Sequence, residues 1–180
     1  LEKLYRRYTG ESLAVKLSDF ADVSERIQYL VTQVEEITKI DNFGAYLTAM
    51  LEIDAFFMNE DRHTNNIAVI YNEKTQKYEL SPFFDQGLCM FADINQDYPI
   101  DQSLEYCLEK IEAKPFSSDF DIQLDAAEEL YGIQIGFQFT FKDIQIYLQK
   151  NSENYPREVI RRVEQLLRRQ MRKYGYLMKK

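Results

Sequence analysis

Apolar residues recur at helical spacing in two neighbouring stretches of the first third of the chain. In Val23–Lys39 they stand three or four positions apart, which predicts an amphipathic helix, and Asp22 is placed to cap its first turn. The polar pair Asp41-Asn42 is then predicted to cap a second helix, Phe43–Met58, that is apolar on more than one face. A helix that is apolar nearly all round is buried, so this second helix is predicted to run through the core.

The other predicted helices rest on shorter patterns. Residues 1–18 are mixed, because Thr9-Gly10 interrupts any helix there. Helices are expected at 103–113, 119–131, 139–149 and 157–178. Pro115 should end the first of these helices. Pro156 suits the first turn of the last of these helices.

A short β-hairpin is predicted between the buried helix and the helix at 103–113. Ile67–Tyr71 has the composition of a strand, Asn72–Gln76 that of a turn, and Lys77–Leu80 that of a second strand. The expected fold class is therefore mainly α (α+β), in which one small hairpin belongs to a helical domain.

The composition fits one globular domain spanning residues 1–180. The chain is 45% hydrophobic and 29% charged, as in an ordinary globular protein. No apolar run approaches the roughly 20 residues that span a bilayer, so we expect no membrane insertion. Cys89 and Cys107 lie far from each other and from His63, the only histidine, which argues against a zinc site. They suit free thiols in a reducing environment, so a cytoplasmic location is expected.

The charge is unevenly distributed along the chain. The net charge of −8 argues against a general affinity for nucleic acid, and no direct nucleic-acid partner is expected. Residues 157–180 contain nine Lys and Arg against two Glu, a net charge of +7 that leaves −15 for the rest. A basic amphipathic helix can bind a membrane or nucleic acid, although packing against its own acidic domain is the favoured interpretation here.

Three polar acceptor residues flank the predicted hairpin: Asp61 and Asn66 before it, and Asp85 after it. Because a hairpin returns the chain to its starting point, Asp85 is expected to come back beside Asn66. Carboxylate and amide oxygens suit a magnesium ion that carries a nucleotide. The remaining carboxylate, Asp61, suits a hydroxyl group whose proton must leave.

These residues also resemble the catalytic and metal-binding loops of kinases. Asp61-Arg62-His63 with Asn66, then a hairpin, then Asp85-Gln86-Gly87 is similar to the atypical branch that contains the HipA-type toxin kinases and the phosphatidylinositol kinases. The longer strings Asn59–Asn66 and Pro82–Gly87 are most similar to bacterial HipA-related proteins of toxin–antitoxin systems. The resemblance implies the helical large lobe of a protein-kinase-like fold, with the hairpin carrying the metal site.

The resemblance also implies roles for individual residues. Asp61 would be the catalytic base, and Asn66 and Asp85 would be the magnesium ligands that hold ATP. His63 is either a further catalytic participant or a structural hydrogen-bonding residue, and Gly87 would let the backbone turn away after Asp85. The implied function is an ATP- and magnesium-dependent kinase, with a protein serine or threonine as the first choice of phosphorylated substrate.

The small lobe of a kinase has no convincing counterpart in this sequence. A kinase needs a glycine-rich loop and a strand lysine, and the only candidate, Lys16, stands too close to Asp61 along the chain. We therefore expect the large lobe alone, nearly inactive by itself, with the small lobe removed or supplied by another chain. An apolar surface is expected where that lobe would sit, formed by Leu13, Val15, Leu80, Phe83 and Phe84.

Two other functions remain open from the sequence. One is a non-catalytic interaction scaffold descended from a kinase lobe. The other is metal-dependent phosphate hydrolysis, which usually requires more carboxylates, and Asp93 is the only obvious addition. Asp54, inside the buried helix, is expected either to brace the loop Asn59–Asn66 through the backbone amides of that loop or to lie on a narrow wet edge of the helix.

Overall fold

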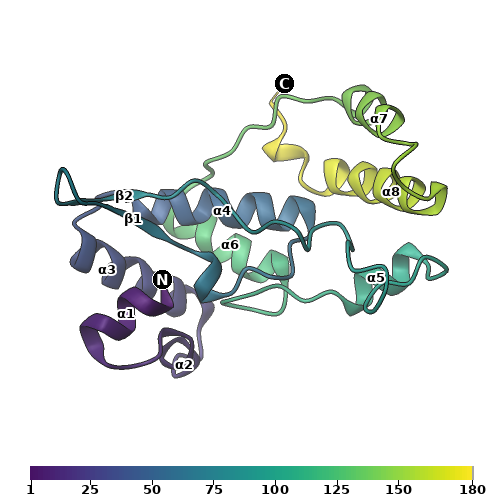
Figure 1. The fold of residues 1–180 in the computed structure, drawn as a ribbon. Helices are drawn as coiled ribbons and strands as arrows, with labels where there is room; N and C mark the ends of the chain where they lie inside the picture. The colour runs from purple at the N-terminus through teal and green to yellow at the C-terminus, as the bar shows by residue number, and fades with distance from the viewer. Residues whose placement is uncertain (180) are drawn as a thin grey trace.

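The protein is described by a computed structural model that covers residues 1–179. It is mostly helical with one two-stranded antiparallel sheet, which confirms the predicted mainly α class (Figure 1). The elements in chain order are α1 (Glu2–Thr9), α2 (Leu13–Ser18), α3 (Val23–Thr38), α4 (Phe43–Phe57), the 3-10 turn η1 (Thr64–Asn66), β1 (Val69–Asn72), β2 (Lys77–Leu80), α5 (Leu104–Lys110), α6 (Phe120–Tyr131), α7 (Phe141–Lys150), α8 (Arg157–Lys173) and the 3-10 turn η2 (Gly175–Leu177).

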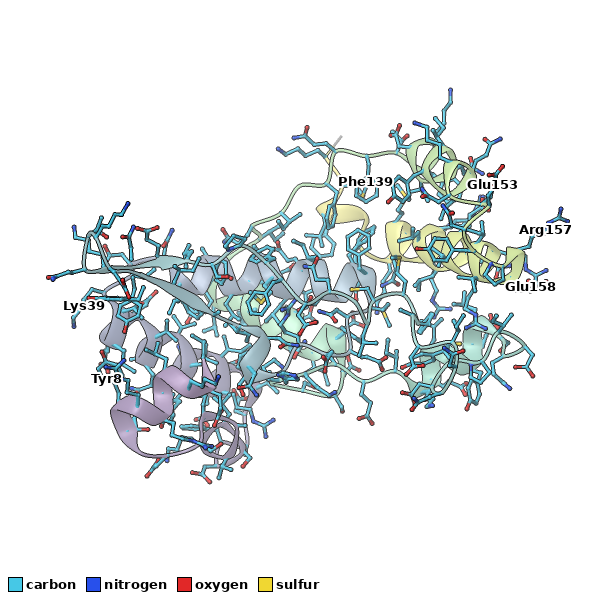
Figure 2. The ribbon with its side chains drawn as sticks, in the orientation of Figure 1. Tyr8, Lys39, Phe139, Glu153, Arg157 and Glu158 are labelled. Atoms are coloured by element: carbon cyan, nitrogen blue, oxygen red, sulfur yellow. The ribbon has the colours of Figure 1, made fainter. Side chains whose placement is uncertain are left out.

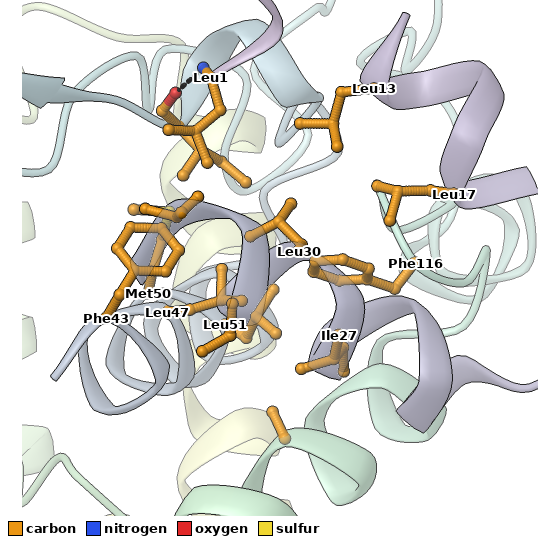
Figure 3. Close-up of a cluster of buried hydrophobic side chains, with 14 of the residues drawn as sticks. Leu1, Leu13, Leu17, Ile27, Leu30, Phe43, Leu47, Met50, Leu51 and Phe116 are labelled. Atoms are coloured by element: carbon orange, nitrogen blue, oxygen red, sulfur yellow. Dashed lines mark hydrogen bonds between the residues drawn. The ribbon is translucent and has the colours of Figure 1, made fainter. Parts of the chain in front are cut away.

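Helix α4 runs through the middle of the molecule and contributes to both clusters of the core. Its first half, including Phe43 and Leu47, packs with buried residues of α2 and α3, as the close-up in Figure 3 shows. Residues of α1 and of the hairpin belong to or pack against the same cluster. Its last residues, Ala55 and Phe56, pack instead with residues of α5–α8. The buried helix predicted at 43–58 is therefore confirmed, and it positions the chain that follows it.

Helix α6 lies close against α4. A Cβ atom on Gly44 would lie 2.5 Å from the ring of Tyr131, so only glycine permits this approach of the two helices. Thr48 reinforces the contact, since its hydroxyl lies 3.4 Å from the carbonyl oxygen of Ala127.

Polar caps set the start of most helices. The Asp22 carboxylate accepts a hydrogen bond from the Glu25 amide at 3.0 Å, as the sequence predicted. Side chains of Ser103, Asp119 and Thr140 cap α5, α6 and α7 in the same way. The predicted cap of α4 is wrong: Asn42 makes no side-chain cap hydrogen bond, and the amide of Phe43 donates instead to Glu35 of α3 at 3.0 Å.

The predicted hairpin is present, and its first strand begins two residues later and ends one residue later than predicted. Val69 pairs with Leu80 and Tyr71 with Tyr78. Val69, Tyr78 and Leu80 pack against the first core cluster, so one side of the hairpin is fixed to the body of the protein.

The N-terminal segment differs from the sequence prediction. Residues 1–18 form two short helices, because Gly10 ends α1 in a left-handed conformation and Ser12 caps α2. Lys16 lies on α2 and pairs with Asp19 at 3.2 Å, which agrees with its rejection as a phosphate-binding strand lysine.

The expected continuous apolar surface is wrong in part. Leu13 is 1% exposed, because it lies on the inner side of α2. Leu80 and Phe83 are partly buried and pack against the first core cluster. Only Val15 and Phe84 are exposed, at 65% and 38%, and they belong to different elements.

The final helix is shorter than predicted. Helix α8 ends at Lys173, and the chain turns through η2. The turn lets Leu177 accept a hydrogen bond from the Phe137 amide at 2.8 Å, while the Lys179 amide donates to Phe137 at 2.9 Å. Burial of Tyr174 and Leu177 in the second core cluster therefore competes with continuation of the helix.

No helix within residues 1–179 is both long enough and apolar enough to cross a bilayer.

Candidate functional site

A buried carboxylate of α4, Asp54, holds the loop Asn59–Asn66 in place. Asp54 has no exposed surface and accepts two hydrogen bonds from the Arg62 guanidinium, from Nε at 2.6 Å and from Nη2 at 3.0 Å. The Asn59 side-chain amide donates to the same carboxylate at 2.8 Å. Burial raises the pKa of Asp54, and the Arg62 cation opposes that shift. Of the two expectations for Asp54, bracing of the loop is confirmed, but the expected backbone-amide donors are wrong, because the Arg62 guanidinium and the Asn59 side chain bind the carboxylate instead.

Arg62 also joins the two ends of the hairpin. Its Nη1 donates to the carbonyl oxygen of Asn66 at 2.6 Å and to that of Phe84 at 3.0 Å. The two carbonyls therefore lie side by side on one nitrogen, although the residues are 18 positions apart. A fully buried, always charged guanidinium thus fixes the backbone that precedes Asp85 next to Asn66.

Asp61 and Asn66 are in direct contact. The Asn66 side-chain amide donates to the Asp61 carbonyl oxygen at 2.9 Å and to the Asp61 carboxylate at 3.2 Å. Asn66 is buried, whereas the Asp61 side chain keeps 27% of its surface exposed. Because both contacts use the nitrogen of the Asn66 carboxamide, its oxygen is left for another partner.

Asp85 lies on the exposed side of this arrangement. It follows Phe84 directly and has a left-handed backbone conformation, with φ of 57°. Aspartate tolerates this conformation better than most residues do. Gly87, which was expected to turn the backbone, has no left-handed conformation, so the turn is made at Asp85 itself.

Sequence reasoning missed one cation at the site. The Lys114 Nζ atom lies 3.9 Å from the Asp61 carboxylate, and half of the Lys114 side-chain surface is exposed. Gln123 of α6 accepts from the Phe116 amide at 3.4 Å and donates to the Lys114 carbonyl at 3.2 Å, which positions this segment. No local pattern marks Lys114, because the contact joins residues 53 positions apart.

His63 is placed mainly by a local hydrogen bond. Its Nδ1 atom accepts from the Asn65 amide at 3.2 Å, which leaves Nε2 as the protonated nitrogen of the neutral ring. Nε2 lies 3.8 Å from the Asp61 carboxylate, too far for a hydrogen bond. The local hydrogen bond thus holds the His63 ring beside Asp61, and a catalytic role for His63 stays a prediction.

The donor set fits a magnesium ion that carries a nucleotide better than a metal ion held by protein alone. Magnesium is often bound through one or two side-chain oxygens together with substrate phosphates. The Asn66 carboxamide oxygen and the Asp85 carboxylate supply such oxygens. Within residues 1–179, no group of three or more His, Cys, Asp or Glu side chains is placed to hold a metal ion.

The two cysteines do not contribute a nucleophile. Cys89 and Cys107 are free thiols. Burial raises the pKa of the Cys89 thiol to about 12, so it carries no appreciable thiolate at neutral pH. The chemistry at this site therefore rests on oxygen and nitrogen groups.

Comparisons with known proteins found no family model, no curated protein and no solved structure that matches this chain. Its function therefore has to be argued from the arrangement of its own residues.

Proposed function

We propose that this chain is the helical large lobe of a HipA-like kinase, and that it transfers a phosphoryl group from ATP, with magnesium, to a hydroxyl of a protein. The single observation that carries the proposal is the position of Arg62, which binds the carbonyls of Asn66 and Phe84 at once. This contact supports the proposal because it holds the backbone of Phe84, the residue before Asp85, on the same nitrogen as the backbone of Asn66.

Phosphoryl transfer requires little covalent help from the protein, so positioning and charge neutralisation dominate. Asp61 accepts the proton of the attacking hydroxyl, and its contact with Asn66 fixes the carboxylate in place. Asn66 and Asp85 would hold magnesium, which supplies charge neutralisation at the phosphates. General-base assistance of this kind contributes about 10²–10⁴-fold to the rate.

The proposal includes a second lobe, on the same polypeptide or on another chain. Lys16 lies on the helix α2 and pairs with Asp19, so it offers no phosphate-binding strand lysine. The chain by itself is therefore expected to bind magnesium–ATP weakly and to transfer little phosphate.

Titration calorimetry of the chain with magnesium–ATP tests the proposal. Asp85→Asn should abolish the weak binding, because it removes a charged metal ligand. Glu73→Gln is the matched control, since Glu73 is an exposed carboxylate in the turn of the same hairpin. Equal loss in both variants, or no magnesium-dependent binding by the unaltered chain, would favour the non-catalytic scaffold instead.

A further inference from the structure

A second charged surface lies away from the candidate site, between α8 and the segment that leads into α5. Figure 1 shows α5 below α8 at the end of the molecule opposite the hairpin turn. An open groove of about 1050 Å³ lies there, and α8 and residues 100–105 line it. Six cationic side chains line the groove: Arg161, Arg162, Arg168, Arg169, Arg172 and Lys173.

Three of these cations are already engaged. Arg162 is buried and donates to the backbone carbonyls of residues 98, 99 and 102, so it holds one wall of the groove in place. Lys173 pairs with Asp121 at 2.6 Å. Arg168 lies 3.6 Å from Glu164 and stacks over the Phe141 ring at 4.0 Å.

The other three arginines are exposed and form no ion pair within residues 1–179: Arg161, Arg169 and Arg172. They stand at helical spacing along one side of α8, over about 16 Å of helix. The favoured interpretation of the basic helix was packing against its own acidic domain. The apolar side of α8 packs against the second core cluster, whereas the side that carries Arg161, Arg169 and Arg172 is exposed.

Arginine has a planar group that binds carboxylates and phosphates through two parallel hydrogen bonds, and three such groups in a row select an extended anionic ligand. The groove also contains the apolar residues Ile100 and Leu104, and the carboxylates Asp101, Glu105 and Glu158. Figure 2 marks Glu158 at the start of α8, beside Arg157, whose side chain points away from the fold.

A continuous phosphate backbone carries a charge at every position, so part of it would lie against these carboxylates. A short peptide can place its acidic side chains on the arginines and its apolar side chains on Ile100 and Leu104. The mixed lining of the groove therefore favours a peptide over a nucleic acid.

We propose that this arginine groove binds an acidic peptide segment. We assign that peptide segment to the protein substrate, an assignment that rests on the proposed function. Tyr98 connects the two places, because its carbonyl accepts from Arg162 while its hydroxyl donates to Glu60, the neighbour of Asp61. Tyr98 therefore links one wall of the groove to the loop that carries Asp61.

Fluorescence anisotropy tests the proposal directly. The probe is a labelled ten-residue peptide of alternating Glu and Ser with a Leu at each end, and the same peptide with Gln in place of Glu is the neutral comparison. The chain should bind only the acidic peptide. The triple variant Arg161→Gln/Arg169→Gln/Arg172→Gln should weaken binding about tenfold, given the small contribution of each exposed ion pair.

The matched control removes three exposed cations far from the groove, Lys3→Gln/Arg7→Gln/Lys74→Gln, and should leave the affinity unchanged. Equal weakening by both triple variants would overturn the proposal, since it would show attraction by overall charge. Tighter binding of a single-stranded oligonucleotide of equal charge would also overturn it, in favour of nucleic acid. The measurement uses neither ATP nor magnesium, so its failure is distinguishable from failure of the proposed kinase activity.

Discussion

Replacement of Arg62 by alanine should destabilise the protein more than almost any other single substitution. The guanidinium is fully buried and makes four hydrogen bonds, to the Asp54 carboxylate and to the carbonyls of Asn66 and Phe84. Removing one partner of a buried ion pair costs about 3–5 kcal/mol. Each carbonyl left without a donor adds roughly 1–3 kcal/mol if water does not replace the arginine. Against a typical stability of about 5–15 kcal/mol, the loss brings the domain close to unfolding.

The measurement is urea unfolding followed by circular dichroism, and the double variant Asp54→Asn/Arg62→Met provides the comparison. It should be more stable than Arg62→Ala, because neither charge is left buried without a partner. In Arg62→Ala the unpaired Asp54 has a pKa raised further by burial. Such a group is tolerated below its unfolded pKa and costs stability as the pH rises through its folded pKa, so the variant should lose more stability at pH 7 than at pH 4. A loss below about 1 kcal/mol, or a double variant no more stable than the single one, would refute this reasoning.

If the proposed function holds, Lys114→Gln should lower phosphoryl transfer without changing magnesium–ATP affinity, because Lys114 lies 3.9 Å from the carboxylate of the proposed base, Asp61; a parallel loss of affinity in calorimetry would contradict this. Gly44→Ala should cost about 1–3 kcal/mol in urea unfolding, because its methyl group meets the Tyr131 ring, and full stability would show that the helices can separate. Burial raises the pKa of Glu52 above its ordinary value of 4.5, although two backbone amides oppose the shift. The stability of the unaltered protein relative to Glu52→Gln should therefore fall as the pH rises above about 4.5, which unfolding at several pH values measures.

The helical framework could be predicted because its signals are local. The stripe in α3 and the apolar faces of α4 follow from residue spacing, and the cap at Asp22 lies within four residues of the amide it binds. The two N-terminal helices were missed because α1 and α2 are too short for a periodic pattern. The end of α8 was misplaced because burial of Leu177 is decided by Phe137, a residue 40 positions away.

In the candidate site, too, the features set by local sequence could be predicted, and those set by distant residues could not. Asp61, Asn66 and the return of the hairpin could be inferred from sequence, since a hairpin constrains its own ends. The bracing of the loop by Asp54 was one of two open interpretations, because burial of one helix face depends on the whole fold. Lys114 could not be predicted, since α6 positions it from a distant part of the chain. Nor could the left-handed turn at Asp85, which local residue preferences assigned to Gly87.

The central claim is that Asn66 and Asp85 bind one metal ion together with a nucleotide. The most direct measurement is the nuclear magnetic resonance spectrum of the ¹⁵N-labelled chain with ATP and a trace of Mn²⁺ in place of Mg²⁺, since a bound paramagnetic ion broadens nearby amide signals. A metal ion bound by Asn66 and Asp85 with ATP should broaden the amide signals of residues 61–66 and 85–87 only when ATP is present. This broadening should disappear in the variant Asp85→Asn. Broadening confined to other acidic surfaces, or broadening that does not depend on ATP, would contradict it.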